Sequence, residues 1–182
     1  LDEIFYVNLF NEVGAAVADA QAVVTIQDDD EAFVSIANAT IVEGQIGTFT
    51  VTLDLTLSLA VERSVTYDYA SSDSGVFPAT DGVDYTGISG TISFATYETA
   101  RTLSVLIAGD ILDEYDETFV VDLSNAVNAS IADGQSVVTI VDNDFTQLSI
   151  GDGAVVETDG ATVPFTMTIS LDIPSVRIVT VD

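Results

Sequence analysis

Carboxylates are the side chains in this sequence that could do chemistry. Thirty Asp and Glu residues stand against three basic residues, and the chain contains neither His nor Cys. These absences exclude disulfides, Cys/His zinc sites, thiol catalysis and a Ser-His-Asp triad. Oxygen ligands remain, and a hard cation such as Ca²⁺ takes about six to eight of them. The residue types therefore favour a hard-cation site over a catalytic one.

The acids that draw attention lie at four turns of the chain. They are Glu43, Asp84, a cluster within residues 110–117, and the pair Asp142 and Asp144 that follows a β-branched run. Carboxylates brought together from several loops can share more than one calcium ion, whereas without metal they repel one another. Elsewhere in the chain, single acids are interpreted as a solvated surface.

An internal repeat indicates which elements must position these acids. Residues 1–30 align without a gap on residues 115–144, which lie 114 positions further along, and both end in Val-Val-Thr-Ile followed by acids. We therefore interpret residues 1–30 as the last part of one unit, 31–144 as a complete unit and 145–182 as the first part of the next. The period suits an independent sandwich domain better than one turn of a solenoid. The chain is predicted to be a piece of a longer tandem array.

Alternation of apolar and polar residues predicts β-strands throughout the complete unit, and no segment has the spacing of an amphipathic helix. Gly, Asp, Asn and Ser separate the apolar segments. This pattern predicts an all-β, immunoglobulin-like β-sandwich, repeated about every 114 residues. The expected strands are 33–41, 46–54, 62–70, 87–94, 100–107, 117–124 and 129–141.

Several short phrases, in order along residues 31–144, resemble the Calx-β domain, a sandwich module of sodium/calcium exchangers and large extracellular repeat proteins. The phrases are Ile41-Val42-Glu43-Gly44, Tyr69-Ala70-Ser71-Ser72-Asp73, Gly82-Val83-Asp84-Tyr85, Gly90-Thr91-Ile92-Ser93-Phe94, Asp116-Glu117-Thr118-Phe119 and Val138-Thr139-Ile140-Val141-Asp142-Asn143-Asp144.

The resemblance implies Ca²⁺ as the bound ion, held at one end of the sandwich near the next domain. The ligands that it carries over are Glu43, Asp84, Asp110, Glu114, Glu117, Asp142 and Asp144. Weaker candidates are Asp113, Asp116 and Asn143 in the same unit, with Glu3, Asp28, Asp30 and Glu157 in the flanking parts. Two departures from the family pattern, Gly109 before Asp110 and Asn143 between two acids, predict one to three ions for each unit.

Charge and motif content exclude several other functions. The formal charge of −27 makes nucleic-acid binding implausible, and no apolar run is long enough to span a membrane. EF-hand spacing is absent after Asp28, and no Trp or aromatic cleft accompanies the acids as a glycosidase would require. We predict that the chain is not an enzyme.

The function expected is structural: a calcium-stiffened, secreted or cell-surface rod of tandem units in an adhesin, filament or matrix protein. Its partners would be neighbouring repeats or like subunits, with a cell-surface or matrix partner in addition. Two alternatives stay open, namely a calcium sensor of a membrane transporter or receptor and an accessory module of a secreted enzyme. Strand exchange between the terminal parts of different subunits is a further alternative to a simple tandem array.

Overall fold

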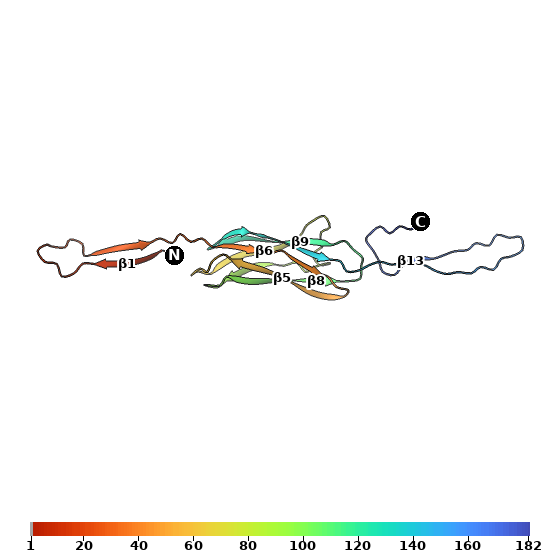
Figure 1. Ribbon diagram of the computed structural model, residues 1–182, viewed down its shortest axis with the longest axis horizontal. Helices are drawn as coiled ribbons and strands as arrows, with labels where there is room; N and C mark the ends of the chain where they lie inside the picture. Colours follow the sequence, from red (N-terminus) through yellow and green to blue (C-terminus); the bar gives the residue numbers. More distant parts are fainter. Residues whose placement is uncertain (1) are drawn as a thin grey trace.

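The fold is a two-layered β-sandwich with a β-hairpin beyond each end (Figure 1). The structure is a computed structural model that describes residues 2–182, and within that range it contains strands, turns and loops but no helix. Consequently, no helix of the described range is long and apolar enough to cross a membrane. This architecture confirms the predicted all-β, immunoglobulin-like fold of the central unit.

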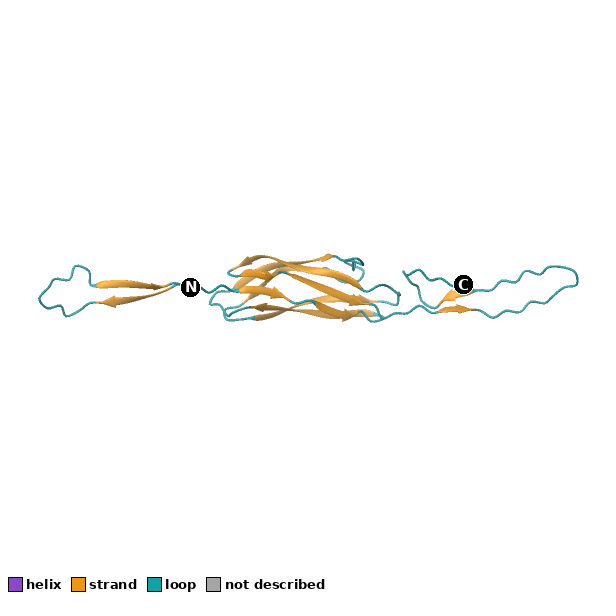
Figure 2. Cartoon of the chain, turned by 45° about the horizontal axis from the view of Figure 1, so that its top comes forward, coloured by secondary structure: helices purple, strands orange, loops and turns teal. Residues whose placement is uncertain are grey.

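The sandwich consists of a four-stranded and a five-stranded sheet, and their strands form two layers in the turned view (Figure 2). The orders are β10-β3-β5-β8 and β4-β11-β9-β6-β7. The strands are β3 (Phe33–Ile36), β4 (Ala39–Val42), β5 (Gly47–Leu57), β6 (Val65–Asp73), β7 (Ser89–Phe94), β8 (Ala100–Gly109), β9 (Glu117–Val127), β10 (Ser130–Asp133) and β11 (Gln135–Val141).

Alternate residues of the central strands fill the space between the sheets. Val51, Leu53 and Leu55 of β5 are buried, and the residues between them are exposed, as period-two patterning requires. Across the core, the rings of Tyr85 and Phe119 stack with their centroids 4.0 Å apart. This packed core gives the acid-bearing loops at its ends a rigid base.

Two segments that the sequence predicts as single strands are each divided in two, because the chain passes from one sheet to the other. Residues 33–41 form β3 and β4, which pair with β5 and β11 respectively. At the crossing, the Ala37 amide donates to the Asp54 carbonyl on β5, while Asn38 Oδ1 accepts from the Val137 amide on β11. Residues 129–141 divide in the same way at Gly134, so that β10 pairs with β3 and β11 with β4 and β9.

The terminal hairpins repeat pairings of the central unit. Strands β1 (Glu3–Asn8) and β2 (Gln21–Ile26) pair in the same register as β9 and β11, at a shift of 114 residues. Strands β12 (Leu148–Ile150) and β13 (Ile169–Leu171) pair in the same register as β3 and β5, at the same shift. Their side chains are solvent-exposed: Phe5 is 47% exposed, whereas its counterpart Phe119 is fully buried. Assignment of these segments to neighbouring units stays a prediction.

Tyr85→Phe should destabilise the sandwich by about 0.5–1.5 kcal/mol. The hydroxyl of Tyr85 donates a 2.8 Å hydrogen bond to Asp73 Oδ1, and the substitution removes it while the ring keeps its stack on Phe119. Urea unfolding followed by circular dichroism would measure the difference. An unchanged midpoint would show that the hydroxyl contributes no net stability.

Candidate metal centre

The acidic end of the sandwich is built where two parallel strands finish together. Strands β4 and β11 pair in parallel, with Val42 opposite Val141. The next residues, Glu43 and Asp142, therefore leave the sheet side by side at the same edge. Beyond this edge the chain continues through Asp144 towards the C-terminal hairpin.

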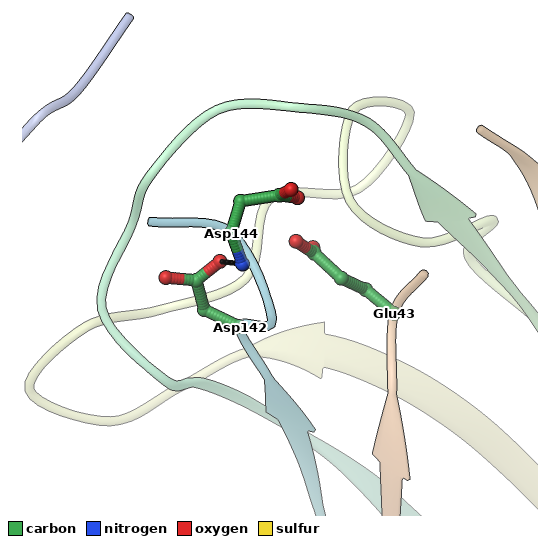
Figure 3. A group of neighbouring side chains, drawn as sticks. All are labelled: Glu43, Asp142 and Asp144. Atoms are coloured by element: carbon green, nitrogen blue, oxygen red, sulfur yellow. Dashed lines mark hydrogen bonds between the residues drawn. The ribbon is translucent and has the colours of Figure 1, made fainter. Parts of the chain in front are cut away.

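The first carboxylate group consists of Glu43, Asp142 and Asp144, one oxygen of each lying within 4.8 Å of the others (Figure 3). The Asp144 amide donates to Asp142 Oδ1 at 2.9 Å in an Asx turn, and the Asp144 carboxylate lies beside that of Glu43. Glu43 is 5% exposed and Asp144 is 4% exposed. Three acids therefore converge in a largely dry space.

The second carboxylate group consists of Asp84, Glu114 and Glu117, whose oxygens also approach within 4.8 Å of one another. Glu117 begins β9, and Glu114 belongs to the preceding loop, where its amide donates to Asp142 Oδ2 at 3.1 Å. The Asp84 carbonyl accepts from the Ala108 amide of β8, which ties its loop to the sheet. The hydrogen bond from Glu114 to Asp142 connects the two groups.

Burial and mutual repulsion raise the pKa values of the three glutamates. Burial, followed by the charges of Asp110 and Asp142, raises the pKa of Glu43 to about 8. Burial and Asp84 raise the pKa of Glu114 to about 7 and that of Glu117 to about 8. Both causes disfavour the ionised form, and a bound cation would reverse them.

Two buried oxygens test whether a cation fits. Glu43 Oε1 and Asp144 Oδ2 are buried, and neither has a hydrogen-bond partner among the residues that the structure describes. Burying polar oxygens without partners costs free energy. A hard divalent cation would offset this cost, because several clustered carboxylate oxygens can bind it together as ligands. The donor set therefore fits a metal ion.

Comparison with known proteins identifies the sandwich. The Calx-β domain family matches residues 27–144. The chain belongs to the Calx-β family. Comparison with curated proteins gives no match.

Solved structures share the Calx-β fold. An apo-form Calx CBD1 domain is 18% identical, with a TM-score of 0.55 over 63% of this chain and 100% of that one. The CBD12 structure from CALX1.2 is 19% identical, with a TM-score of 0.54 over 61% of this chain and 45% of that one. The calcium binding domain CBD12 of CALX1.1 is 20% identical, with a TM-score of 0.52 over 70% and 53%. At these identities the likeness concerns the fold.

The Calx-β unit brings six of the seven principal candidates into the two carboxylate groups, and Asp110 is near both. The charge of Asp110 contributes to the raised pKa values of Glu43, Glu114 and Glu117, although the residue itself is exposed. Its Oδ1 accepts from the Leu112 amide at 2.7 Å, which shapes the loop after β8. An acid whose charge acts on both groups suits a ligand shared by two ions.

The weaker candidates of the Calx-β unit make protein contacts. Asn143 Oδ1 accepts from the Gly44 amide, and Asp116 Oδ1 accepts from the Asp142 amide. Asp113 is 5% exposed and accepts from the Ser175 hydroxyl at 2.8 Å. This hydrogen bond, followed by the charge of Arg177, lowers the pKa of Asp113. These contacts hold the loops in place, and a direct role at a metal stays a prediction for all three residues.

The candidates outside residues 31–144 are more exposed. Glu3, Asp28 and Asp30 line an open cavity of about 690 Å³ between the N-terminal hairpin and the sandwich. The Asp30 amide donates to Asp28 Oδ1, which repeats the Asx turn of Asp142 and Asp144. Glu157 is exposed in the C-terminal segment, outside both carboxylate groups. Their ligand roles also stay predictions.

Sequence reasoning missed Arg177 and the loop-holding role of Asp73. Asp73 Oδ1 accepts from the Asp81 amide and from the Tyr85 hydroxyl, and so fixes the loop that carries Asp84. Arg177 reaches the acidic end of the Calx-β unit from the following segment, with Nη2 2.9 Å from Asp142 Oδ2. The scarcity of basic residues is the sequence signal that could have drawn attention to this arginine.

Proposed function

We propose that this Calx-β unit binds calcium at its acidic end, as a tandem module with a structural or adhesive role in a large extracellular surface, filament or matrix protein. The supporting observation is a pair of buried oxygens, Glu43 Oε1 and Asp144 Oδ2, which have no hydrogen-bond partner within residues 2–182 and lie in a group of three acids. Calcium accepts about six to eight oxygen ligands in a flexible geometry, which matches this donor set.

The two carboxylate groups would each hold an ion. Glu43, Asp142 and Asp144 would form one site and Asp84, Glu114 and Glu117 the other, with Asp110 available to both. Calcium supplies two positive charges for each ion and so removes the repulsion that raises the glutamate pKa values. The protein contributes a preassembled set of oxygens on loops fixed to the core.

The place of the acids in the chain supports the proposed structural role. The residue after Asp144 belongs to the segment that leads to the C-terminal hairpin, so an ion bound here would order the junction as well as the loops. A neighbouring repeat is therefore the first partner proposed, and a cell-surface or matrix molecule is a second. High calcium outside cells would keep even weak sites loaded.

Glu43→Gln should weaken calcium binding at least about tenfold, since it removes a buried anionic ligand while keeping the side-chain size. In EDTA the same substitution should leave stability unchanged or increase it, because the carboxylate repels its neighbours there. Isothermal titration with calcium and urea unfolding in EDTA would measure the two effects.

Asp54→Asn is the matched control for Glu43→Gln, because Asp54 is an exposed acid on β5 without a place in either carboxylate group. If both variants bind calcium as the unchanged protein does, the proposal fails. The titration also discriminates between functions: extracellular modules bind at about 10⁻⁴–10⁻³ M and sensors at about 10⁻⁷–10⁻⁵ M. Affinity in the sensor range would favour regulation of a transporter or receptor over a structural role.

A further inference from the structure

Arg177 joins two carboxylates of the Calx-β unit from outside it. Its Nε lies 3.3 Å from Asp113 Oδ1, and its Nη2 lies 2.9 Å from Asp142 Oδ2. The aspartate side chains are only 8% and 5% exposed, so the ion pairs are poorly screened by solvent. The guanidinium also lies 5.1 Å from the ring centroid of Tyr115, which in turn stacks on Phe77.

Backbone hydrogen bonds place Arg177 in this position. The Asp113 amide donates to the Pro174 carbonyl, and the Val176 amide donates to the Asp113 carbonyl, both at 3.0 Å. The Ser175 hydroxyl donates to Asp113 Oδ2 and accepts from the Arg177 amide. Segment 173–177 is therefore bound to the loop before β9 through its backbone as well as its charge.

Arg177 and Arg63 occupy the same position of the repeat. They are 114 residues apart, which is the period of the chain, and Val-Thr follows each at the same spacing, with Asp at the fifth position beyond each arginine. The chain has three basic residues and thirty acids, so two arginines in one repeat position are a specific feature. A general requirement for solubility would not explain why two arginines occupy the same repeat position.

The junction between the N-terminal hairpin and the sandwich also combines an arginine with aspartates. Arg63 lines the open cavity of about 690 Å³ together with Asp28 and Asp30. Asp28 and Asp30 are the counterparts of Asp142 and Asp144 at a shift of 114 residues. Arg177 therefore contacts the acidic end of the unit that comes before it, and Arg63 shares a cavity with the equivalent acids.

We propose that the acidic end of each unit is a docking surface for the next unit, recognised through one arginine on the loop that precedes that unit's counterpart of β6. Arg177 occupies the surface formed by Asp113 and Asp142, and Arg63 docks in the same manner on the surface that contains Asp28. The partner is a further copy of the same kind of unit.

Hydrogen exchange in the whole 182-residue chain tests the C-terminal joint. Arg177→Gln should accelerate exchange of the Val176 amide about tenfold in EDTA, because the segment loses both carboxylate contacts and opens more often. Exchange of core amides such as Val121 should not change. Arg101→Gln is the matched control, since Arg101 pairs with Glu98 and is not among the residues that line the N-terminal cavity.

Distance measurements test the N-terminal joint. The chain has no cysteine, so spin labels at Thr25→Cys on β2 and Thr50→Cys on β5 report only the position of the hairpin relative to the sandwich. Arg63→Gln should broaden the distance distribution, and Arg101→Gln should leave it unchanged.

The inference is overturned if Val176 keeps its protection in Arg177→Gln, if the label distances stay as narrow in Arg63→Gln, or if Arg101→Gln has equal effects. These results are independent of calcium binding. A protein that shows the arginine effects but binds no calcium would refute the proposed function and leave the joint standing.

Discussion

We expect EDTA to lower the midpoint of thermal unfolding of the Calx-β sandwich by about 10 °C relative to the protein with calcium at about a hundredfold its dissociation constant. Binding to the folded state alone adds about 2.7 kcal/mol at that ratio. For a domain of this size, one kcal/mol shifts the midpoint by about 4 °C. The effect arises because calcium neutralises acids such as Glu43 and Glu117, whose charged forms burial and repulsion disfavour.

Differential scanning calorimetry with and without calcium would measure this shift. Magnesium at equal concentration serves as an ionic-strength control, because it dehydrates reluctantly and demands near-ideal octahedral geometry. The combined substitution Glu43→Gln and Glu117→Gln should remove most of the calcium effect, whereas Asp54→Asn should preserve it. An identical midpoint in EDTA and in excess calcium would refute calcium-dependent stabilisation.

Metal-free protein should become less stable as pH rises from about 5 to about 8.5. The pKa of Glu43 is about 8, that of Glu117 about 8 and that of Glu114 about 7, all above the ordinary value of 4.5. Between those values the folded state binds more protons than the unfolded state, so unfolding becomes easier with increasing pH. A single such carboxyl changes the free energy of unfolding by about 1.4 kcal/mol for each pH unit within its window.

Urea unfolding in EDTA at pH 5.5 and 8.5 would measure this dependence. In saturating calcium the dependence should vanish or reverse, because only ionised carboxylates bind the metal. Glu43→Gln should reduce the slope in EDTA, which separates this site from the general repulsion of an acidic chain. Equal stability of the metal-free protein at both pH values would contradict the assignment.

Asp113 contributes to the pH dependence of stability with the opposite sign, and over a more acidic pH range, than the three glutamates. Its pKa is lowered from the ordinary value of 3.8, first by the Ser175 hydroxyl and then by Arg177. The stability that it contributes is present above the unfolded value and is lost as pH falls through the lower folded value. The contact between Asp113 and Arg177 therefore persists across the range in which the glutamates titrate.

The sandwich could be predicted from the sequence because its core strands alternate regularly, as at Val51, Leu53 and Leu55. The division of residues 33–41 into two strands could not, because Asn38 is a single break residue within an otherwise strand-like segment. The role of Ala37 and Asn38 appears only once Asp54 and Val137 provide partners from opposite sheets. Strand boundaries of this kind are set by tertiary pairing.

The residue types of the candidate site could be predicted from the sequence, but their arrangement in space could be predicted only in part. Acids at turns pointed to a hard cation, but the sequence could not show that Glu43 and Asp142 leave the same edge, because that depends on the parallel pairing of β4 and β11. Nor could it show that Asp113 faces Arg177, since the contact joins segments far apart in the chain. The local sequence shows which side chains could bind a cation. Which of them come together depends on how the strands pair.

Parallel pairing at the start and end of the unit determines how a pulling force would pass through it. Strand β4 pairs with β11 over four residues, and β3 pairs with β10, so early and late strands of the unit run in the same direction. Tension applied between residues 31 and 144 drags these partners past one another and strains their hydrogen bonds together, whereas an antiparallel hairpin pulled at its open end separates one pair at a time. A string of such units would transmit load lengthwise through its sheets.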